Sequence, residues 1–355
     1  MHFVDEEDHI TIARYTNRGY KLYQDIQSNH QPIVYFTSAK LQRLLDPENI
    51  FMLIRRHRQG MFVYGLIWSL LIVWRFKITG LIFVLFFEFL KYYLFGNLWL
   101  MESFAVYPAV YLFGVMLETW INKIILRKIE LIFLGFCSFL VIFNLVPLWP
   151  WLALVWLILL IKLKKRLKWL GLGLLSGIII LFTSNYSPVD WFRETIYNNF
   201  VYAIPALSPY KGPVDWLKMV FFPFLSFLTK NSLQAKFIAF FFSGWLFSLG
   251  YLMIKKDKRA IKFGLIYFFL LLANNRVLSP GTVYYQGFHL LPWLGLMIFT
   301  FGFSLKLINF KFGLIFLIWG TVLMFNKSMP YFLKTDVANE YYINFSTMDD
   351  VNFAI

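Results

Sequence analysis

Long apolar runs, separated by short polar breaks, constrain this sequence more than any other feature. A helix needs about 20 residues to cross a hydrocarbon core about 30 Å thick, and shorter runs need flanking aromatic residues or local thinning. Of the 355 residues, 59% are hydrophobic, whereas a soluble domain has roughly 45–50% apolar residues. The sequence therefore predicts an all-α fold, a polytopic transmembrane helical bundle. We expect about ten spans, at 61–75, 78–94, 103–120, 129–146, 150–163, 169–184, 237–254, 261–274, 288–304 and 311–325.

The basic residues lie mainly in the breaks between these runs. The net charge is +15, which in a soluble chain would suggest a nucleic-acid partner. Here the basic residues occupy alternate breaks, and breaks rich in Lys and Arg face the cytoplasm. These breaks are 75–77, 123–128, 162–168, 255–262 and 306–311. We therefore expect a multi-pass protein of the plasma (inner) membrane. Its expected partner is the lipid bilayer, and we expect no nucleic-acid partner.

The remaining breaks form the external face and hold most of the acidic residues. Residues 1–60 are expected to be a first external loop with helices on the membrane surface, one of them amphipathic near 33–45. Spans then fill 61–184 and 237–325. Between them, 185–236 is a long external loop with an interfacial helix at 219–228, and loops of this length are usually functional or mobile. The shorter external breaks are 96–102, 145–150 and 274–288.

This topology has consequences for both ends of the chain. The N-terminus lies outside although no span and no signal peptide precedes it, so we expect a missing first span upstream. Residues 326–355 are typical of the start of an external C-terminal domain that is cut short. Cys137, the only cysteine, lies inside an apolar run, so it is expected to be a buried small hydrophobic residue without a disulfide.

An acidic cluster with a histidine lies near the start of the first external loop, in the run Asp5-Glu6-Glu7-Asp8-His9. Such a cluster can work as a general base, as a set of metal ligands or simply as a solvated loop. Glu102 lies at the outer mouth of a span, on the same side as Asp5. It is either an interfacial helix cap or an acid that converges with Asp5 from a distant segment.

A second candidate region is the external break before the span at 288–304. Arg276, Tyr285 and His289 lie there, at the outer rim where a phosphate headgroup would be held. The alternatives are a lipid-headgroup contact for Arg276 and a helix-capping role for His289. Pro292 would lie in the first turn of the span and is expected to be structural.

These residues carry a resemblance to a known family. The first external loop resembles that of the C superfamily of membrane glycosyltransferases, in the bacterial branch that includes aminoarabinose transferase and protein O-mannosyltransferase-like enzymes. Segments 96–104 and 288–292 are similar to that family's second acidic motif and its late span entrance. The matching pattern of the first loop is Phe3-x-Asp5-Glu6-x-x-His9-x-x-x-Ala13-Arg14, Gly19-x-x-Leu22-Tyr23-x-Asp25 and Asn29-x-Gln31-Pro32-x-x-Tyr35.

The resemblance implies a transfer reaction on the external (periplasmic) face. The donor is a polyprenyl-phosphate sugar, and the acceptor is a hydroxyl of a lipid, a glycan or a protein. Asp5 is implied as the general base, while Glu6 and Glu102 position substrate or, together with Asp5, a divalent cation such as Mg²⁺ or Mn²⁺. The implied neighbours of the donor phosphate or substrate are His9, Arg276, Tyr285 and His289. A base on the acceptor and positive charge on the leaving phosphate suit this displacement.

Three other functions share parts of this pattern. A flippase or transporter of a lipid-linked saccharide needs charges inside the spans, and the candidates are Glu88, Lys91 and Glu118. A polysaccharide polymerase has the same plan of many spans with large external loops. A purely structural membrane protein would have little use for a long acidic external segment. The Asp5-Glu6 pair near the start of the chain favours the glycosyltransferase.

Overall fold

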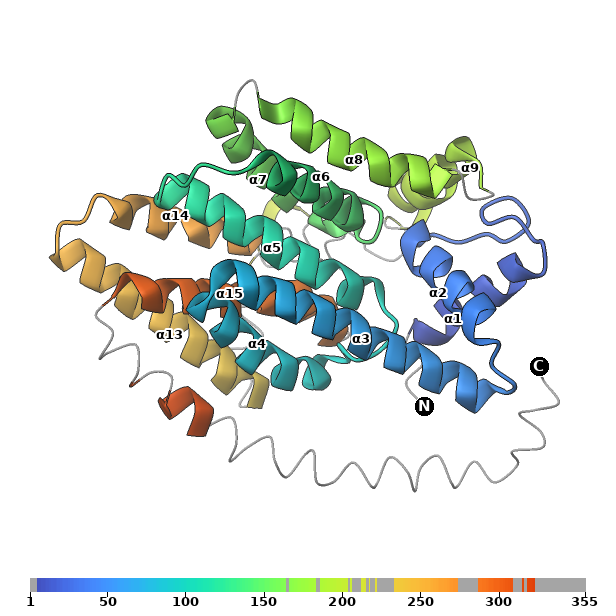
Figure 1. Cartoon of the computed structure of the whole chain (residues 1–355), viewed down its shortest axis with the longest axis horizontal. Coiled ribbons are helices and arrows are strands. Elements are labelled where there is room, and N and C mark those ends of the chain that lie inside the picture. The colour runs from blue at the N-terminus through green and yellow to red at the C-terminus, as the bar shows by residue number, and fades with distance from the viewer. Residues whose placement is uncertain are drawn as a thin grey trace.

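The computed structural model describes residues 5–163, 166–182, 186–203, 233–273 and 287–308, together with short pieces between 205 and 221 and between 315 and 322. These residues form helices and connecting turns, with no extended strand among them (Figure 1). The α-helices are α1 (Glu6–Asn17), α2 (Pro32–Leu45), α3 (Ile50–Phe76), α4 (Ile78–Leu90), α5 (Met101–Ile121), α6 (Lys128–Ile142), α7 (Trp149–Leu163), α8 (Leu167–Phe182), α9 (Pro188–Phe192), α13 (Leu233–Ile254), α14 (Arg259–Leu272) and α15 (Leu291–Leu307). Short 3₁₀ or π-helical turns are η1 (Lys91–Leu94), η2 (Val146–Leu148), η4 (Arg193–Tyr197), η5 (Asn199–Ala203) and η6 (Gly287–Leu290).

The apolar runs of the sequence coincide with these helices. Each expected span up to 288–304 overlaps a helix, whereas 311–325 lies largely outside the described residues. Four helical stretches are long and apolar enough to cross a membrane, and three shorter apolar helices accompany them. The four are Ile50–Phe76, Met101–Ile121, Val146–Leu163 and Phe288–Leu307. The all-α class is confirmed, while the expected number of about ten spans is not confirmed.

Helix α5 forms the centre of the bundle. All of its residues are buried except Trp120, which is partly exposed. A helix that is apolar on every face has to be enclosed by other elements, and α3, α6, α7, α14 and α15 pack around it (Figure 1). The N-terminal end of α5, with Glu102 in its first turn, is therefore held in a fixed place by the whole bundle.

Helix α3 shows the opposite pattern, with a wide apolar face on the outside. Phe62, Leu66, Leu70 and Trp74 are between 47% and 69% exposed, and their spacing places them on one face of the helix. Contiguous apolar patches of this kind are rare on soluble monomers. Together with the apolar length of the four candidate spans, this face indicates a membrane protein.

The five basic breaks meet at one end of the bundle. Arg75 at the end of α3 pairs with Glu118 of α5, with 2.7 Å between Nη1 and Oε2, and also with Glu130 of α6. Lys306 of α15 lies 3.8 Å from the Glu118 carboxylate. Residues of two further basic breaks donate hydrogen bonds to backbone carbonyls at this end. Lys262 Nζ donates to the Trp120 carbonyl oxygen at 2.8 Å, and Arg166 donates to the Leu126 carbonyl oxygen. This common end is what the alternating basic topology requires, whichever side of a membrane it faces.

Helices α1 and α2 form a compact platform at the other end of the bundle (Figure 1). Their packing is fixed by two side-chain amides that donate to backbone carbonyls, Gln42 to Ile10 at 2.9 Å and Asn17 to Ala39 at 3.0 Å. Both helices lie in the stretch where the sequence predicts interfacial helices. Helix α3 begins at Ile50 and includes the basic cluster 55–58, so the boundary expected at residue 60 falls within this helix.

The segment 188–203 lies beside this platform as one helical run, comprising α9, η4 and η5. Its Trp191 ring packs against Phe143 and Phe182, with ring centroids 5.2 and 6.3 Å away. The described start of the segment 185–236 is therefore helical and packs against α6 and α8. The interfacial helix expected at 219–228 lies almost entirely outside the described residues.

Helices α6 and α8 approach each other closely through two glycines. A Cβ built on Gly173 would lie 1.8 Å from the Ile132 carbonyl oxygen, and one on Gly135 would lie 2.0 Å from the Leu170 carbonyl oxygen. A Cβ on Gly171, two residues from Gly173 on the same helix, would meet nothing within 4 Å. Small residues permit this close backbone approach in membrane helices.

These contacts predict opposite effects for two otherwise identical substitutions. Gly173→Ala forces α6 and α8 apart and should lower the free energy of unfolding by about 1–3 kcal/mol, the usual penalty of overpacking. Gly171→Ala adds a methyl group to open space and should leave stability unchanged or slightly raised, because alanine is the better helix former. Thermal unfolding of both variants in detergent checks this, and equal melting temperatures would contradict the close packing at Gly173.

Candidate functional site

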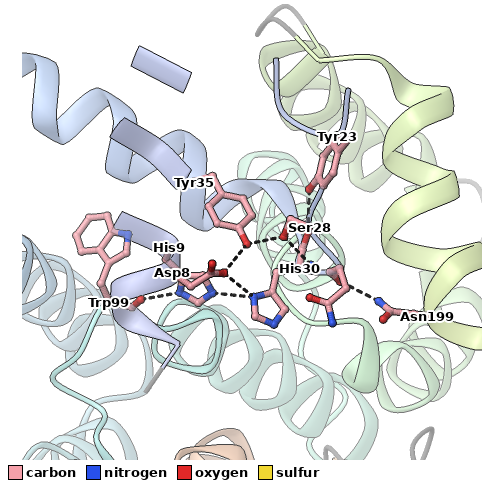
Figure 2. Close-up of polar contacts among 9 residues, drawn as sticks. Asp8, His9, Tyr23, Ser28, His30, Tyr35, Trp99 and Asn199 are labelled. Carbon is pink, nitrogen blue, oxygen red and sulfur yellow. Dashed lines mark hydrogen bonds and ion pairs between the residues drawn. The ribbon is translucent and has the colours of Figure 1, made fainter. Parts of the chain in front are cut away.

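The site is built on the backbone N–H and carbonyl groups of Trp99, just before α5. Glu6 and His9 lie one turn apart on α1, so their side chains leave the helix on the same face. Glu6 Oε1 accepts a hydrogen bond from Trp99 N–H at 2.9 Å. Figure 2 shows the second contact, in which His9 Nδ1–H donates to the Trp99 carbonyl oxygen at 3.0 Å. The second oxygen of Glu6 pairs with Arg58 of α3 at 3.1 Å. Helix α1 is therefore fastened to the entrance of the central helix by two buried side chains.

The Trp99 side chain extends these connections to α2 and α3. Its indole Nε1–H donates to the Val34 carbonyl oxygen at 3.1 Å. Its ring meets the His57 ring edge to face, with centroids 4.8 Å apart. A single residue thus holds α1, α2 and α3 around the N-terminal end of α5.

A histidine pair continues from this anchor toward the surface (Figure 2). Because His9 donates through Nδ1, its Nε2 is an acceptor when the ring is neutral, and His30 Nδ1 lies 3.1 Å from it. Without other ligands, His30 Nδ1–H therefore donates to His9 Nε2. Asp8 Oδ2 lies 3.8 Å from the same His30 nitrogen. His9 is fully buried, whereas the Asp8 side chain is 53% exposed.

A chain of hydroxyl groups ends at the same carboxylate. His30 N–H donates to Ser28 Oγ at 3.2 Å, and Ser28 Oγ lies 2.6 Å from the Tyr35 hydroxyl. Tyr35 O–H donates to Asp8 Oδ2 at 3.4 Å. Tyr23 O–H supports the turn by donating to the His30 carbonyl oxygen at 2.8 Å (Figure 2). Asp8 is therefore approached by one imidazole and one phenol.

Burial is the main cause of the pKa shifts of His9, Tyr35 and Glu7 in and beside this cluster. Desolvation, with a smaller effect of the neighbouring His30, lowers the pKa of His9 from 6.5 to about 3, so the ring is neutral at physiological pH. Burial and then the charge of Asp8 raise the pKa of the Tyr35 phenol well above its usual value of 10, so that phenol stays a donor. Burial, followed by the charge of Glu6, raises the pKa of Glu7.

A hollow of about 710 Å³ opens beside Asp8. It lies between α1, the turn before α2 and the helical run 188–203, and most of its lining residues have polar side chains. Asn199 Nδ2 donates to the Asn29 carbonyl at 2.8 Å, and Trp191 Nε1 donates to Gln31 Oε1 at 3.1 Å, so the two walls are tied together. The lining consists of Asp8, Ile12, Gln27, Ser28, Asn29, Glu194, Asn198, Asn199, Tyr202 and Ala203.

A second hollow, of about 520 Å³, lies on the other side of α2 and is basic. Lys21, Lys40 and Arg43 contribute to its lining, together with the aromatic side chain of Phe36. Ile180 of α8 closes one wall and belongs to a row of exposed apolar residues on that helix. Cationic groups thus lie beside a surface suited to lipid chains.

The structure brings three of the sequence-predicted segments together around residues 98–102. Glu6 and His9 bind Trp99, while Leu98 and Leu100 form a buried cluster with Phe288, next to His289 in η6. Glu102 is buried in the first turn of α5 and His289 is half-buried. Asp5 occupies the N-cap position of α1 without a capping hydrogen bond from its side chain and is partly exposed; after burial and Asp8, its charge adds a smaller effect that raises the pKa of Tyr35. Arg276 and Tyr285 lie outside the described residues.

Sequence reasoning did not assign roles to several residues of this site. Asp8 and His30 were visible, one in the acidic run and the other in Asn29-His30-Gln31-Pro32 just before α2, but nothing in their spacing joined them. The polar lining from 194 to 202 comes from a segment that was expected to be an external loop. Compared with protein-family models, curated proteins and solved structures, the chain has no match.

The contacts of Glu6 predict that its charge stabilises the fold. Glu6→Gln removes the ion pair with Arg58, and we expect the free energy of unfolding to fall by about 1–2 kcal/mol, because hydrogen bonds to charged groups are stronger than neutral ones. Glu7→Gln, which removes the same charge from an exposed neighbour on α1, is the matched control and should change stability little. Thermal or denaturant unfolding in detergent measures both, and equal losses would count against a structural role for Glu6.

Proposed function

We propose that the protein is a membrane glycosyltransferase of the hexosyl- or pentosyltransferase type. In this proposal it moves a sugar from a polyprenyl-phosphate donor to an acceptor hydroxyl of a lipid, a glycan or a protein. The platform of α1 and α2 faces the outside of the plasma (inner) membrane, and the basic end of the bundle faces the cytoplasm. Helices shorter than the four long candidates complete the set of about ten spans.

The polar hollow beside Asp8 is the observation that carries this proposal. Its volume of about 710 Å³ falls within the roughly 300–1,000 Å³ of small-molecule sites. Two carboxylates and three asparagine amides contribute to its lining, and these groups offer the neighbouring donors and acceptors that sugar hydroxyls require. Tyr202 adds an aromatic side chain to the same lining, which can pack against the apolar face of a sugar ring.

The basic hollow supports a lipid-phosphate donor. Lys21, Lys40 and Arg43 can bind a phosphate through charge-assisted hydrogen bonds. The exposed apolar row of α8, which includes Ile180 at 54% exposure, offers a path for the polyprenyl chain. Arg276 and His289 remain assigned to the donor phosphate as predictions from the sequence.

In the proposed reaction Asp5 removes the proton of the acceptor hydroxyl. The acceptor oxygen forms a bond to the anomeric carbon, and the bond from that carbon to the phosphate oxygen breaks. Polyprenyl phosphate leaves with the electron pair, and the anomeric centre is inverted by this direct displacement. General-base assistance of this kind contributes roughly 10²- to 10⁴-fold in rate.

The transporter alternative has less support. Its charged candidates inside the bundle are paired, since Lys91 Nζ lies 2.5 Å from Glu88 Oε2 and Tyr107 O–H donates to Glu88 Oε1 at 2.6 Å. Glu118 is paired with Arg75. Both hollows are lined mainly by the α1–α2 platform and its neighbours, which favours chemistry at the membrane surface over passage through the helices.

Asp5→Asn tests the proposed base. The substitution keeps the shape of the side chain but removes its basicity, so turnover should fall by about 10²- to 10⁴-fold. The measurement is donor consumption in liposomes that contain the full-length protein and a panel of radiolabelled polyprenyl-phosphate sugars. Glu7→Gln is the control, because it removes the same charge from the same helix outside the site.

The outcomes of this assay separate the candidate functions. Consumption that is lost in Asp5→Asn and kept in Glu7→Gln supports a lipid-linked sugar transferase with Asp5 as base. Wild-type turnover in Asp5→Asn would remove Asp5 from the mechanism. Absence of consumption with every donor would favour a transporter or a polymerase instead.

The basic hollow makes a separate prediction about the donor. The double variant Lys40→Gln/Arg43→Gln should raise the KM for the donor by about tenfold, which corresponds to about 1.4 kcal/mol of lost phosphate binding. The KM for the acceptor should change little. Arg55→Gln/Arg56→Gln removes the same charge near the start of α3 and is the control. An equal rise in both KM values would argue against a phosphate site in this hollow.

A further inference from the structure

Asp8, His9 and His30 place three potential metal-binding atoms together. Each residue offers one ligand atom within 4.8 Å of those of the other two, and the close contacts run from His9 Nε2 to His30 Nδ1 and from His30 Nδ1 to Asp8 Oδ2 (Figure 2). They come from α1 and from the turn before α2, which are separate in sequence but fixed to each other by the packing of the platform. The cluster shares no residue with Asp5, Glu6 and Glu102, the set that the family resemblance implied for a cation, although Asp8 and His9 belong to the acidic run that the sequence offered as possible metal ligands.

The distances suit one small ion held by all three atoms. Metal-ligand bonds near 2.0 Å in a tetrahedral site put neighbouring ligand atoms about 3.3 Å apart. His9 Nε2 and His30 Nδ1 are 3.1 Å apart, and His30 Nδ1 and Asp8 Oδ2 are 3.8 Å apart. The Asp8 side chain is 53% exposed, so its oxygen has room to approach the ideal separation.

The surroundings hold these ligands in the orientation that a metal requires. Metal-bound histidines usually donate their other ring N–H to a carbonyl or carboxylate, and His9 Nδ1–H already donates to the Trp99 carbonyl at 3.0 Å. Tyr35 O–H donates to Asp8 Oδ2. His30 is held through its backbone, with its N–H on Ser28 and its carbonyl oxygen on Tyr23. His9 and Asp8 are thus positioned by partners other than the proposed ion, and the backbone of His30 is fixed by the same turn.

We propose that Asp8, His9 and His30 bind a divalent transition-metal ion of the Zn²⁺ class. Two imidazoles and one carboxylate suit Zn²⁺, whereas Mg²⁺ prefers oxygen ligands and keeps several waters. Three protein ligands leave a fourth position for water or substrate, as in catalytic zinc sites. Asp8 and Ser28 also line the polar hollow, so this fourth position faces the space proposed for the sugar.

Metal binding competes with one hydrogen bond of the metal-free protein. In that state the proton on His30 Nδ1 points to His9 Nε2, and the ion takes its place. His30 then carries its proton on Nε2 instead, so the ring stays neutral and no proton is lost. The inference goes beyond the proposed sugar transfer, and binding is measured without any sugar donor, so failure of one proposal is separate from failure of the other.

The test uses the full-length protein in detergent, purified without a polyhistidine tag and stripped with a chelator. Co²⁺ is titrated first, because a tetrahedral site of this kind gives strong visible absorption and an octahedral one gives weak absorption. Zn²⁺ is then titrated against a chromogenic competitor. We expect one equivalent of tetrahedral Co²⁺, displaced by Zn²⁺, in the wild type and in the matched control Glu7→Gln.

The ligand variants decide the result. Asp8→Asn and His30→Gln change partly exposed side chains, so they should fold, and circular dichroism with thermal unfolding checks that they do. We expect each substitution to weaken Zn²⁺ binding by at least tenfold and to abolish the tetrahedral Co²⁺ spectrum. Wild-type affinity in either folded variant, or an octahedral spectrum in the wild type, would overturn the proposal and leave His9 and His30 as a hydrogen-bonded pair.

Discussion

The platform depends on the hydrogen bonds made by the backbone N–H and carbonyl groups of Trp99. This residue lies in a buried stretch outside any helix, where an unpaired backbone N–H or carbonyl is costly. Both groups find partners on α1, the N–H on Glu6 and the carbonyl oxygen on His9. The position of α1, and with it Asp5 and Asp8, is therefore set by the entrance of α5, the most deeply buried helix of the bundle. The same two hydrogen bonds position the walls that the α1–α2 platform contributes to both hollows.

The helices of the bundle could be predicted from the sequence because their cause is local. An apolar run has to satisfy its backbone internally in a nonpolar setting, and a helix does so within the run. Basic breaks then mark the ends of the runs, as the contacts of Arg75, Arg166 and Lys306 bear out. The start of α3 was missed because the cluster 55–58 resembles a break. Asn49, whose side chain accepts from Met52 N–H at 2.9 Å, begins the helix earlier, and the basic residues follow within its first turns.

The site was predictable only in part, and for a physical reason. The acidic run and His9 stand out in one short stretch, whereas His30 and Asn199 reach them only through folding, across 21 residues from His9 to His30 and 170 from Asn29 to Asn199. Glu6 shows the opposite difficulty. It matches an acidic motif, yet both of its oxygens are occupied by Trp99 and Arg58. Sequence alone cannot distinguish a carboxylate that is held this way from one that faces a substrate.

Tyr35 lies between the two hollows. Its ring lines the basic hollow, and its hydroxyl donates to Asp8, which lines the polar hollow. A phosphate bound in the basic hollow and the Asp8 carboxylate would be two anionic groups on opposite sides of this residue. Burial and the charge of Asp8 raise the pKa of Tyr35, which keeps the phenol neutral. A protonated phenol at that position adds no third negative charge, and its hydrogen bond holds the Asp8 carboxylate on its own side of α2.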